Sequence, residues 1–162
     1  MTGLAVHPAS FRDPEVRIVL RDGEVFRELV PKAAAFFEQL FEDGRIAQLT
    51  EDCHLIATEL VELDATEARY DRRGLHHEAL AAQTYPWEWS FEMRREAALA
   101  TAGLLEGAIK QGLNLKDGTP LNLAFHKGRM VWFDVLSLTP LQRRDLWIGY
   151  DQFCRLQLFP LL

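Results

Sequence analysis

The sequence predicts an α+β fold in which a strand-rich first part, residues 1–84, precedes a helical second part, residues 85–162. Alternating apolar runs around an Asp-Gly pair predict a hairpin near the start. An apolar stripe at helical spacing predicts one long helix in the second half. With 162 residues and 48% hydrophobic content, the chain can bury a core. We therefore expect one compact unit made of two small lobes.

The first part alternates predicted strands with short helices. Asp22-Gly23 predicts the turn of the hairpin, and Pro31 favours the start of a helix that Gly44 ends. The charged segment 64–74 is predicted to be a loop. The expected elements are strands at 16–20 and 24–29, helices at 31–42 and 45–50, and strands at 54–63 and 75–84.

The second part begins with an aromatic joint, residues 85–90, in which Pro86 keeps the preceding residue extended. Ser90 is expected to cap the long helix, and Gly112 to end it. A turn at Gly128 predicts a hairpin, and Pro160 should stop the final helix. The expected elements are helices at 92–111 and from 141 or 145 to 159, with strands at 123–126 and 130–133.

Composition excludes several classes of function. The net charge is -6 with acids and bases interspersed, so no basic stripe is available for a nucleic acid. No window approaches the ~20 apolar residues of a membrane span. Residues 1–11 lack the pattern of a signal peptide. Cys53 and Cys154 lie far apart in apolar contexts, which predicts reduced, buried thiols in a cytoplasmic protein.

The stretch with the clearest chemistry is residues 115–122, LKDGTPLN, followed by Asp134 at the end of a predicted strand. Transfer of a phosphoryl group to a hydroxyl needs a carboxylate near the proton and hard oxygen ligands for Mg²⁺. Asp117 could be the base, and the hairpin would bring Asn122 and Asp134 together as metal ligands. The alternative is structural, because Asp-Gly and Asn are common in turns and an Asp after a strand often caps a helix.

The order of elements, with a strand-rich lobe, a hinge, a long helix and then this loop, is similar to that of protein kinases and aminoglycoside phosphotransferases. The resemblance implies a small kinase-like domain with a reduced N-lobe that binds ATP and Mg²⁺. Lys116 would neutralise phosphate charge, the alternative being a pair with Asp117 or a surface carboxylate. Trp87 would stack the adenine, the alternative being that it fills the contact between the lobes. Two kinase features are missing, the GxGxxG loop and the Val-Ala-Ile-Lys strand. The lysines of the chain are Lys32, Lys110, Lys116 and Lys127.

A narrower resemblance rests on several blocks of sequence. They are residues 7–11, 21–27, 85–91 (YPWEWSF), 97–99, 115–117 (LKD), Asn122, 133–137 (FDVLS) and 150–154 (YDQFC). These blocks resemble the kinase-like N-terminal region of certain bacterial class I S-adenosylmethionine-dependent methyltransferases. The resemblance implies a domain that normally precedes a methyltransferase. The chain has no glycine-rich strand-to-helix turn followed by an acidic residue, so we expect no S-adenosylmethionine site in it.

Two functions follow from the sequence. The first is a kinase-like domain that binds Mg²⁺-nucleotide and transfers a phosphoryl group to a small molecule. The second is a non-catalytic accessory or docking domain for a methyltransferase domain or subunit, in which the loop residues are structural turns. Whether the chain is an active phosphotransferase or a pseudokinase stays open at this point.

Overall fold

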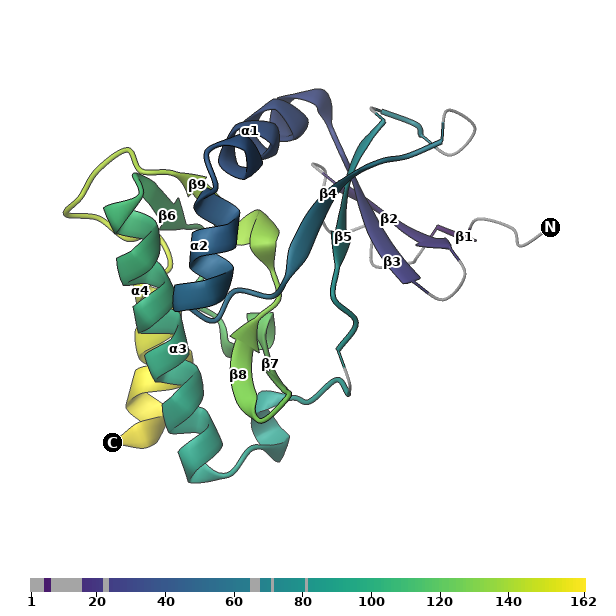
Figure 1. Ribbon diagram of the computed structural model, residues 1–162. Helices are drawn as coiled ribbons and strands as arrows, with labels where there is room; N and C mark the ends of the chain where they lie inside the picture. Colours follow the sequence, from purple (N-terminus) through teal and green to yellow (C-terminus); the bar gives the residue numbers. More distant parts are fainter. Residues whose placement is uncertain (1–4, 7–15, 22–23, 65–67, 71, 81) are drawn as a thin grey trace. The chain divides into compact units, whose positions relative to one another are not determined.

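The computed structural model describes residues 5–6, 16–21, 24–64, 68–70, 72–80 and 82–162. The chain divides into two compact units, the first formed by residues 1–46 and 57–79 and the second by 47–56 and 80–162. The first unit is rich in strands and the second in helices, so the predicted α+β class is confirmed (Figure 1). The prediction divides the chain once, after residue 84, whereas here residues 47–56 belong to the second unit.

A five-stranded antiparallel sheet, in the order β1-β2-β3-β5-β4, forms the first unit (Figure 1). The hairpin is confirmed, since Arg21 pairs with Glu24, while its turn residues 22–23 lie outside the described residues. Helix α1 (Pro31–Glu42) packs against β3 and β4. The strands are β1 (Ala5–Val6), β2 (Val16–Arg21), β3 (Glu24–Leu29), β4 (Thr58–Glu62) and β5 (Arg73–His77). Buried residues Val19, Phe26 and Leu63 form a core cluster.

Strands β4 and β5 differ from their predicted limits. The predicted strand at 54–63 does not begin at His54, whose φ of 60° is left-handed, and β4 starts at Thr58. Strand β5 includes Gly74, which the prediction put in a loop. A Cβ on Gly74 would lie 3.1 Å from Leu63 Cγ, so the lack of a side chain lets a core leucine pack on this strand.

His77 is a titratable group of the sheet whose pKa is strongly perturbed. Its Nδ1 lies 2.9 Å from Thr58 Oγ1, across the pairing of β4 with β5. Burial lowers the pKa of His77 to about 3, and the charges of Arg27 and His76 add to the effect. The imidazole therefore stays neutral in the folded protein at ordinary pH.

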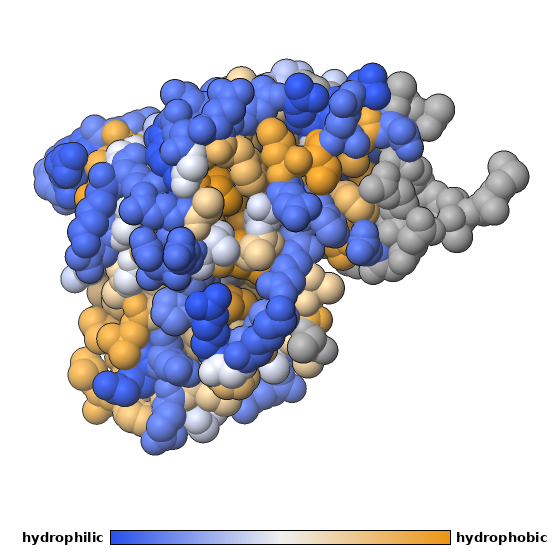
Figure 2. All heavy atoms as spheres, viewed as in Figure 1, coloured by the Kyte–Doolittle hydropathy of each residue, from blue (hydrophilic) through white to orange (hydrophobic). Residues whose placement is uncertain are grey.

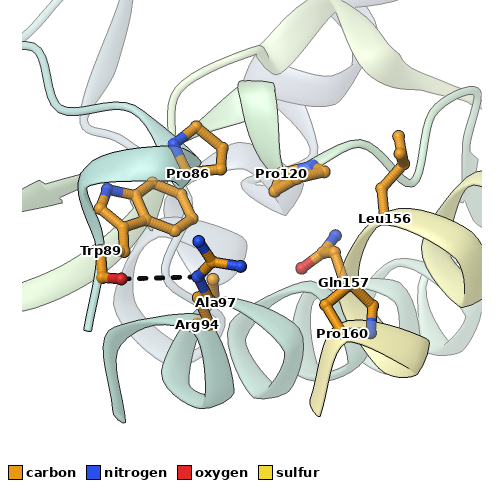
Figure 3. A pocket seen from close by; sticks show the side chains of 8 residues that line it. All are labelled: Pro86, Trp89, Arg94, Ala97, Pro120, Leu156, Gln157 and Pro160. Atoms are coloured by element: carbon orange, nitrogen blue, oxygen red, sulfur yellow. Dashed lines mark hydrogen bonds between the residues drawn. The ribbon is translucent and has the colours of Figure 1, made fainter. Parts of the chain in front are cut away.

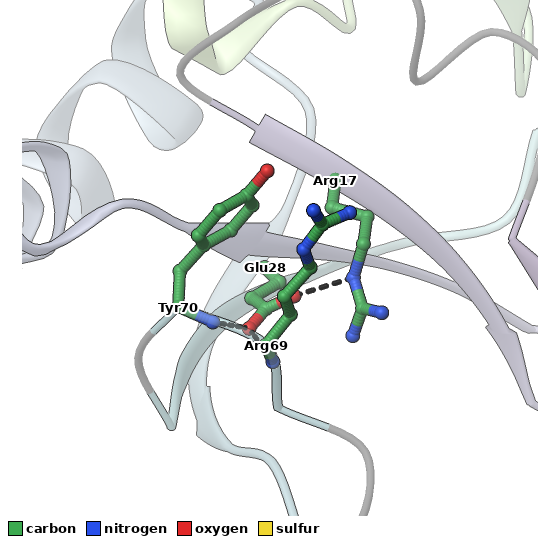
Figure 4. Close-up of polar contacts among 4 residues, drawn as sticks. All are labelled: Arg17, Glu28, Arg69 and Tyr70. Carbon is green, nitrogen blue, oxygen red and sulfur yellow. Dashed lines mark hydrogen bonds and ion pairs between the residues drawn. The ribbon is translucent and has the colours of Figure 1, made fainter.

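A buried carboxylate joins the sheet to the segment before β5. Glu28 on β3 is fully buried, and its carboxylate accepts a hydrogen bond from Arg17 Nε on β2 (Figure 4). The same carboxylate accepts the backbone N–H groups of Arg69 and Tyr70. Several donors thus satisfy a charge that would otherwise be costly to bury.

The long helix of the second unit is α3 (Phe91–Lys110). Ser90 Oγ accepts the N–H of Met93 at 3.2 Å, so the predicted cap is confirmed. The end of α2 (Arg45–Asp52) continues into Cys53, which lies against Gly107 of α3. One face of α3 is buried, at Ala97, Ala98, Ala100, Thr101, Leu104 and Ala108.

Two short antiparallel pairs complete the second unit. The predicted hairpin is present as β7 (Leu123–His126) and β8 (Arg129–Trp132), with positive φ angles of 48° at Lys127 and 82° at Gly128. The second pair joins β6 (Leu113–Leu115) to β9 (Leu138–Pro140), and the sequence prediction did not contain it. Strand β9 lies where the prediction had only a connection before the last helix.

The end of the chain is helical without a break from residue 150 to residue 161, so the predicted final helix is present but begins later than residue 141 or 145. Helix α4 (Tyr150–Phe153) is followed by a π-helical turn (Cys154–Leu158) and a 3₁₀ turn (Phe159–Leu161). Pro160 lies in the first turn of the last of these and does not stop it. Across the described ranges, none of the helices combines the length and apolar character needed to cross a membrane.

Candidate functional site

The loop that carries Asp117 follows β6 directly. The backbone N–H of Lys116 donates to the carbonyl of Ser137 at 2.7 Å, which extends the pairing of β6 with β9 by one step. Ser137 ends a 3₁₀ turn (Val135–Ser137) that begins just after Asp134. The loop of Asp117 therefore runs beside the turn of Asp134, and both carboxylates are half-buried.

Asn122 joins the same neighbourhood through the hairpin. It ends a 3₁₀ turn (Pro120–Asn122), and its carbonyl accepts the N–H of Phe133 at 2.9 Å. Leu123 pairs with Trp132, so the residues that enter and leave the hairpin lie opposite each other. The hairpin thus places Asn122 next to the residue that precedes Asp134.

The carboxylate of Asp134 does not cap the helical turn that follows it. Asp134 occupies the N-cap position of that turn without a capping hydrogen bond from its side chain. Its backbone carbonyl accepts Trp132 Nε1 at 2.9 Å and Ser137 Oγ at 2.8 Å. The structure therefore removes the helix-cap explanation for this residue.

A close backbone contact supports the loop of Asp117. A Cβ on Gly149 would lie 2.6 Å from both Asp117 C and Gly118 N, and a Cβ on Gly118 would lie 2.2 Å from Gly149 O. Real Cβ atoms do not approach other atoms so closely. Glycine is needed at both positions because two backbone segments touch here.

Two glutamines hold the same loop by hydrogen bonds. The N–H of Gly118 donates to Gln152 Oε1 at 2.9 Å, and Gln157 Nε2 donates to the carbonyl of Gly118 at 2.8 Å. Gln157 is buried and also exchanges hydrogen bonds with Thr101 of α3. The loop is thereby tied to both α4 and α3.

A third pair of contacts fixes the strand before the loop. Trp147 Nε1 donates to the carbonyl of Leu115 at 3.0 Å, and Asn114 Nδ2 donates to the carbonyl of Leu146 at 3.1 Å. Sequence reasoning missed these supporting residues. For Gln152 alone a signal existed, because it lies in the block at 150–154, which the methyltransferase resemblance includes but to which it gives no role.

Trp87 is also a predicted site residue, but the backbone hydrogen bonds at Lys116 and Asn122 do not connect it to the other site residues. It lies in a 3₁₀ turn (Pro86–Glu88) and is largely exposed. Its ring stacks on Tyr85, with centroids 4.7 Å apart and an interplanar angle of 3°. One face of the indole is therefore already covered. Thr84, the residue before the joint, anchors it to the hairpin, because Thr84 Oγ1 accepts Trp89 Nε1 at 3.1 Å and the N–H of Phe125 at 3.2 Å.

The donor set of the candidate site suits a hard cation. Asp117, Asn122 and Asp134 offer two carboxylates and an amide oxygen, which are the ligand types that Mg²⁺ takes alongside phosphates and water. Among the described residues there is no group of three or more His, Cys, Asp or Glu side chains that could hold a metal.

A shallow pocket lies beside this site within the second unit (Figure 3). Its volume of about 20 Å³ gives room for one or a few water molecules. Gln157 lines the pocket and also holds Gly118, so the pocket and the loop of Asp117 share a side chain. The other lining residues are Pro86, Trp89, Arg94, Ala97, Pro120, Leu156 and Pro160.

Comparison with known proteins gives one relative and a structural neighbour. No family model matches the chain. It is similar to nodulation protein NoeA of Rhizobium meliloti (strain 1021), with 32% identity over 160 residues that cover 94% of this chain. A crystal structure of the PknI kinase domain of Mycobacterium tuberculosis has a TM-score of 0.47 and 18% identity, over 74% of this chain and 52% of that one. The chain spans about a third of NoeA, 32% of its length.

Proposed function

We propose that this chain is a kinase-like domain that binds a Mg²⁺-nucleotide at the loops of Asp117, Asn122 and Asp134. The observation that carries the proposal is the pair of backbone hydrogen bonds that joins these loops. Lys116 bonds to Ser137, and Phe133 bonds to Asn122. The order of elements leading to this loop supports it further.

The proposal gives each residue a chemical role. Asn122 and Asp134 would offer oxygen ligands to Mg²⁺, and Lys116 would balance phosphate charge. When bound, ATP supplies the phosphoryl group and Mg²⁺ offsets its negative charge. Asp117 would accept the proton of a small-molecule hydroxyl that attacks the terminal phosphoryl group of ATP, and the bond from that group to the leaving ADP would break. Trp87 would offer the exposed face of its indole to the adenine.

The competing proposal is a non-catalytic accessory domain of a methyltransferase. It rests on the sequence blocks of the narrower resemblance and on the missing glycine loop and strand lysine. NoeA contains this region together with a larger amount of further polypeptide, which is compatible with an accessory role. Under this proposal the glycines and glutamines around the loop keep a docking module folded.

Calorimetric titration of ATP, with and without Mg²⁺, separates the two proposals. We expect Mg²⁺-dependent binding in the wild type and at least a tenfold weaker affinity in Asp134→Asn. Asp117→Asn should keep the binding of Mg²⁺-ATP and lose any phosphoryl transfer. The matched control is Asp145→Asn, since Asp145 is an exposed carboxylate paired with Arg143.

Two outcomes would count against nucleotide binding. The first is no heat from the wild type at millimolar ATP with Mg²⁺. The second is an equal loss of affinity in Asp134→Asn and Asp145→Asn, which would point to a general charge effect. In either case the accessory proposal stands alone, and co-expression with a methyltransferase encoded by a neighbouring gene would test it. Failure to form a complex would contradict it.

A further inference from the structure

Arg94 brings a half-buried positive charge to the shallow pocket beside the loop of Asp117. It lies in the first turn of α3, and its Nε donates to the carbonyl of Trp89 at 3.4 Å. Within the described part of the chain, no carboxylate pairs with its two terminal nitrogens, which point into the pocket (Figure 3). A guanidinium in this state can bind a carboxylate through two parallel hydrogen bonds.

The walls around Arg94 are mostly apolar, which strengthens that interaction, and the amide of Gln157 in the lining already bonds to Gly118 and Thr101. Pro86, Pro120 and Pro160 line the pocket together with Trp89. These residues offer no competing acceptor from their side chains, and they lower the local dielectric around the charge. An incoming carboxylate would gain more here than at an open surface.

The pocket is too small for a whole ligand. Its volume of about 20 Å³ is far below the roughly 300 to 1,000 Å³ of sites that enclose small molecules. It can admit the end of one acidic side chain. The rest of the binding partner would have to lie on the surface around the opening.

The surface around the opening of the pocket is rich in exposed apolar side chains. Trp87, Leu121 and Phe159 each adjoin a pocket proline in sequence, and they are 68%, 52% and 58% exposed. Leu156, which lines the pocket, is 50% exposed. Figure 2 shows apolar surface gathered at the lower left, over the turns at the C-terminal end of the chain. Exposed aromatic side chains beside an arginine are the composition of protein-binding hot spots.

We propose that this surface binds an extended polypeptide segment in which one Asp or Glu lies between apolar residues. The carboxylate would enter the pocket and pair with Arg94, while the apolar residues would cover Phe159 and its exposed neighbours. NoeA contains this region within a longer chain, so a relative carries further polypeptide that could supply such a segment. The proposal does not depend on nucleotide binding.

Selection from a phage-displayed library of random twelve-residue peptides, panned on the full chain, tests this inference. We expect the enriched peptides to share an acidic residue flanked by apolar ones. Fluorescence polarisation with synthetic copies should then show at least a tenfold rise in Kd for Arg94→Gln. The matched control is Arg95→Gln, which removes an exposed arginine from the same helix. Phe159→Ala should also weaken binding.

A double-mutant cycle makes the test specific. Replacing the acidic residue of the peptide with its amide should weaken binding to the wild type and add little further loss in Arg94→Gln. Enriched peptides without a common acid, or equal affinity for wild type and Arg94→Gln, would overturn the inference. Displacement of the peptides by millimolar acetate or benzoate would also overturn it, because the site would then belong to small free acids.

Discussion

The contact between Gly149 and the loop of Asp117 gives the sharpest test of how the candidate site is held. Gly149 has a φ of -75°, which alanine adopts without strain. Gly149→Ala therefore tests the space at this position and leaves backbone conformation aside. The new Cβ would lie 2.6 Å from Asp117 C, 2.6 Å from Gly118 N and 2.8 Å from Asp117 O.

The expected cost follows from these distances. To move from 2.6 Å to the 3.4 Å at which ordinary contact begins, the loop must shift by about 0.8 Å. Such overpacking costs about 1 to 3 kcal/mol. The two hydrogen bonds that Gln152 and Gln157 make with Gly118 would weaken, at about 1 kcal/mol each. We expect the free energy of unfolding to fall by about 2 to 4 kcal/mol, and Tm by roughly 5 to 15 °C.

Urea unfolding followed by tryptophan fluorescence measures the effect, and Gly103→Ala is the control. Gly103 lies inside α3, and a Cβ there would meet nothing within 4 Å. This control should gain about 0.5 to 1 kcal/mol of stability. If Gly149→Ala were as stable as Gly103→Ala, the backbone contact would not exist as described. Loss of Mg²⁺-ATP affinity in a folded Gly149→Ala would link the contact to the proposed function.

The remaining predictions concern burial in each unit. Burial lowers the pKa of His77 from its ordinary 6.5 to about 3. Between pH 6.5 and pH 3 the unfolded chain therefore binds a proton at His77 that the folded chain does not. The free energy of unfolding should decrease as the pH drops below 6.5. The loss should be about 1.4 kcal/mol per pH unit, and His77→Gln should flatten the urea-unfolding profile between pH 6.5 and 4. Glu28→Ala should lower the free energy of unfolding by about 3 to 5 kcal/mol, measured with urea. The control is Glu24→Ala, an exposed position on the same strand, which should cost under about 1 kcal/mol. Equal losses in the two variants would contradict the buried hydrogen-bond network of Glu28. Gly107→Ala should destabilise the protein, because its Cβ would lie 2.3 Å from Cys53 Sγ. In thermal melts, the double variant with Cys53→Ala should recover much of the lost stability. If the double variant recovered none of it, the clash would lie elsewhere.

The features that the sequence predicts well are those with a local cause. Ser90 caps α3 because its side chain reaches a backbone N–H three residues away. The hairpin of β7 and β8 follows from a turn at Lys127 and Gly128 between two apolar runs. The neighbourhood of Asn122 and Asp134 was predictable for the same reason, since this hairpin connects them.

The features that escaped prediction depend on residues far apart in the chain. Ser137 pairs with Lys116 only because β9 returns beside β6, and three-residue strands are too short to show an alternating pattern. Gly149 looks like any glycine until its backbone partner is known. Glu28 lies in a strand that reads as alternating, and nothing local announces that a distant segment will satisfy its charge. Sequence alone therefore predicts the short-range contacts of the candidate site and misses the distant residues that support its loops.

The support of the Asp117 loop also has a consequence for protein synthesis. Its hydrogen-bond partners and its glycine contact come from residues 147–157, which the ribosome makes after the loop itself. Until that stretch emerges, the carbonyls of Leu115 and Gly118 lack these partners, and closing the contact must wait for the chain to return. A nascent chain arrested before Trp147 would contain Asp117, Asn122 and Asp134 without the contacts that hold the loop of Asp117 in place.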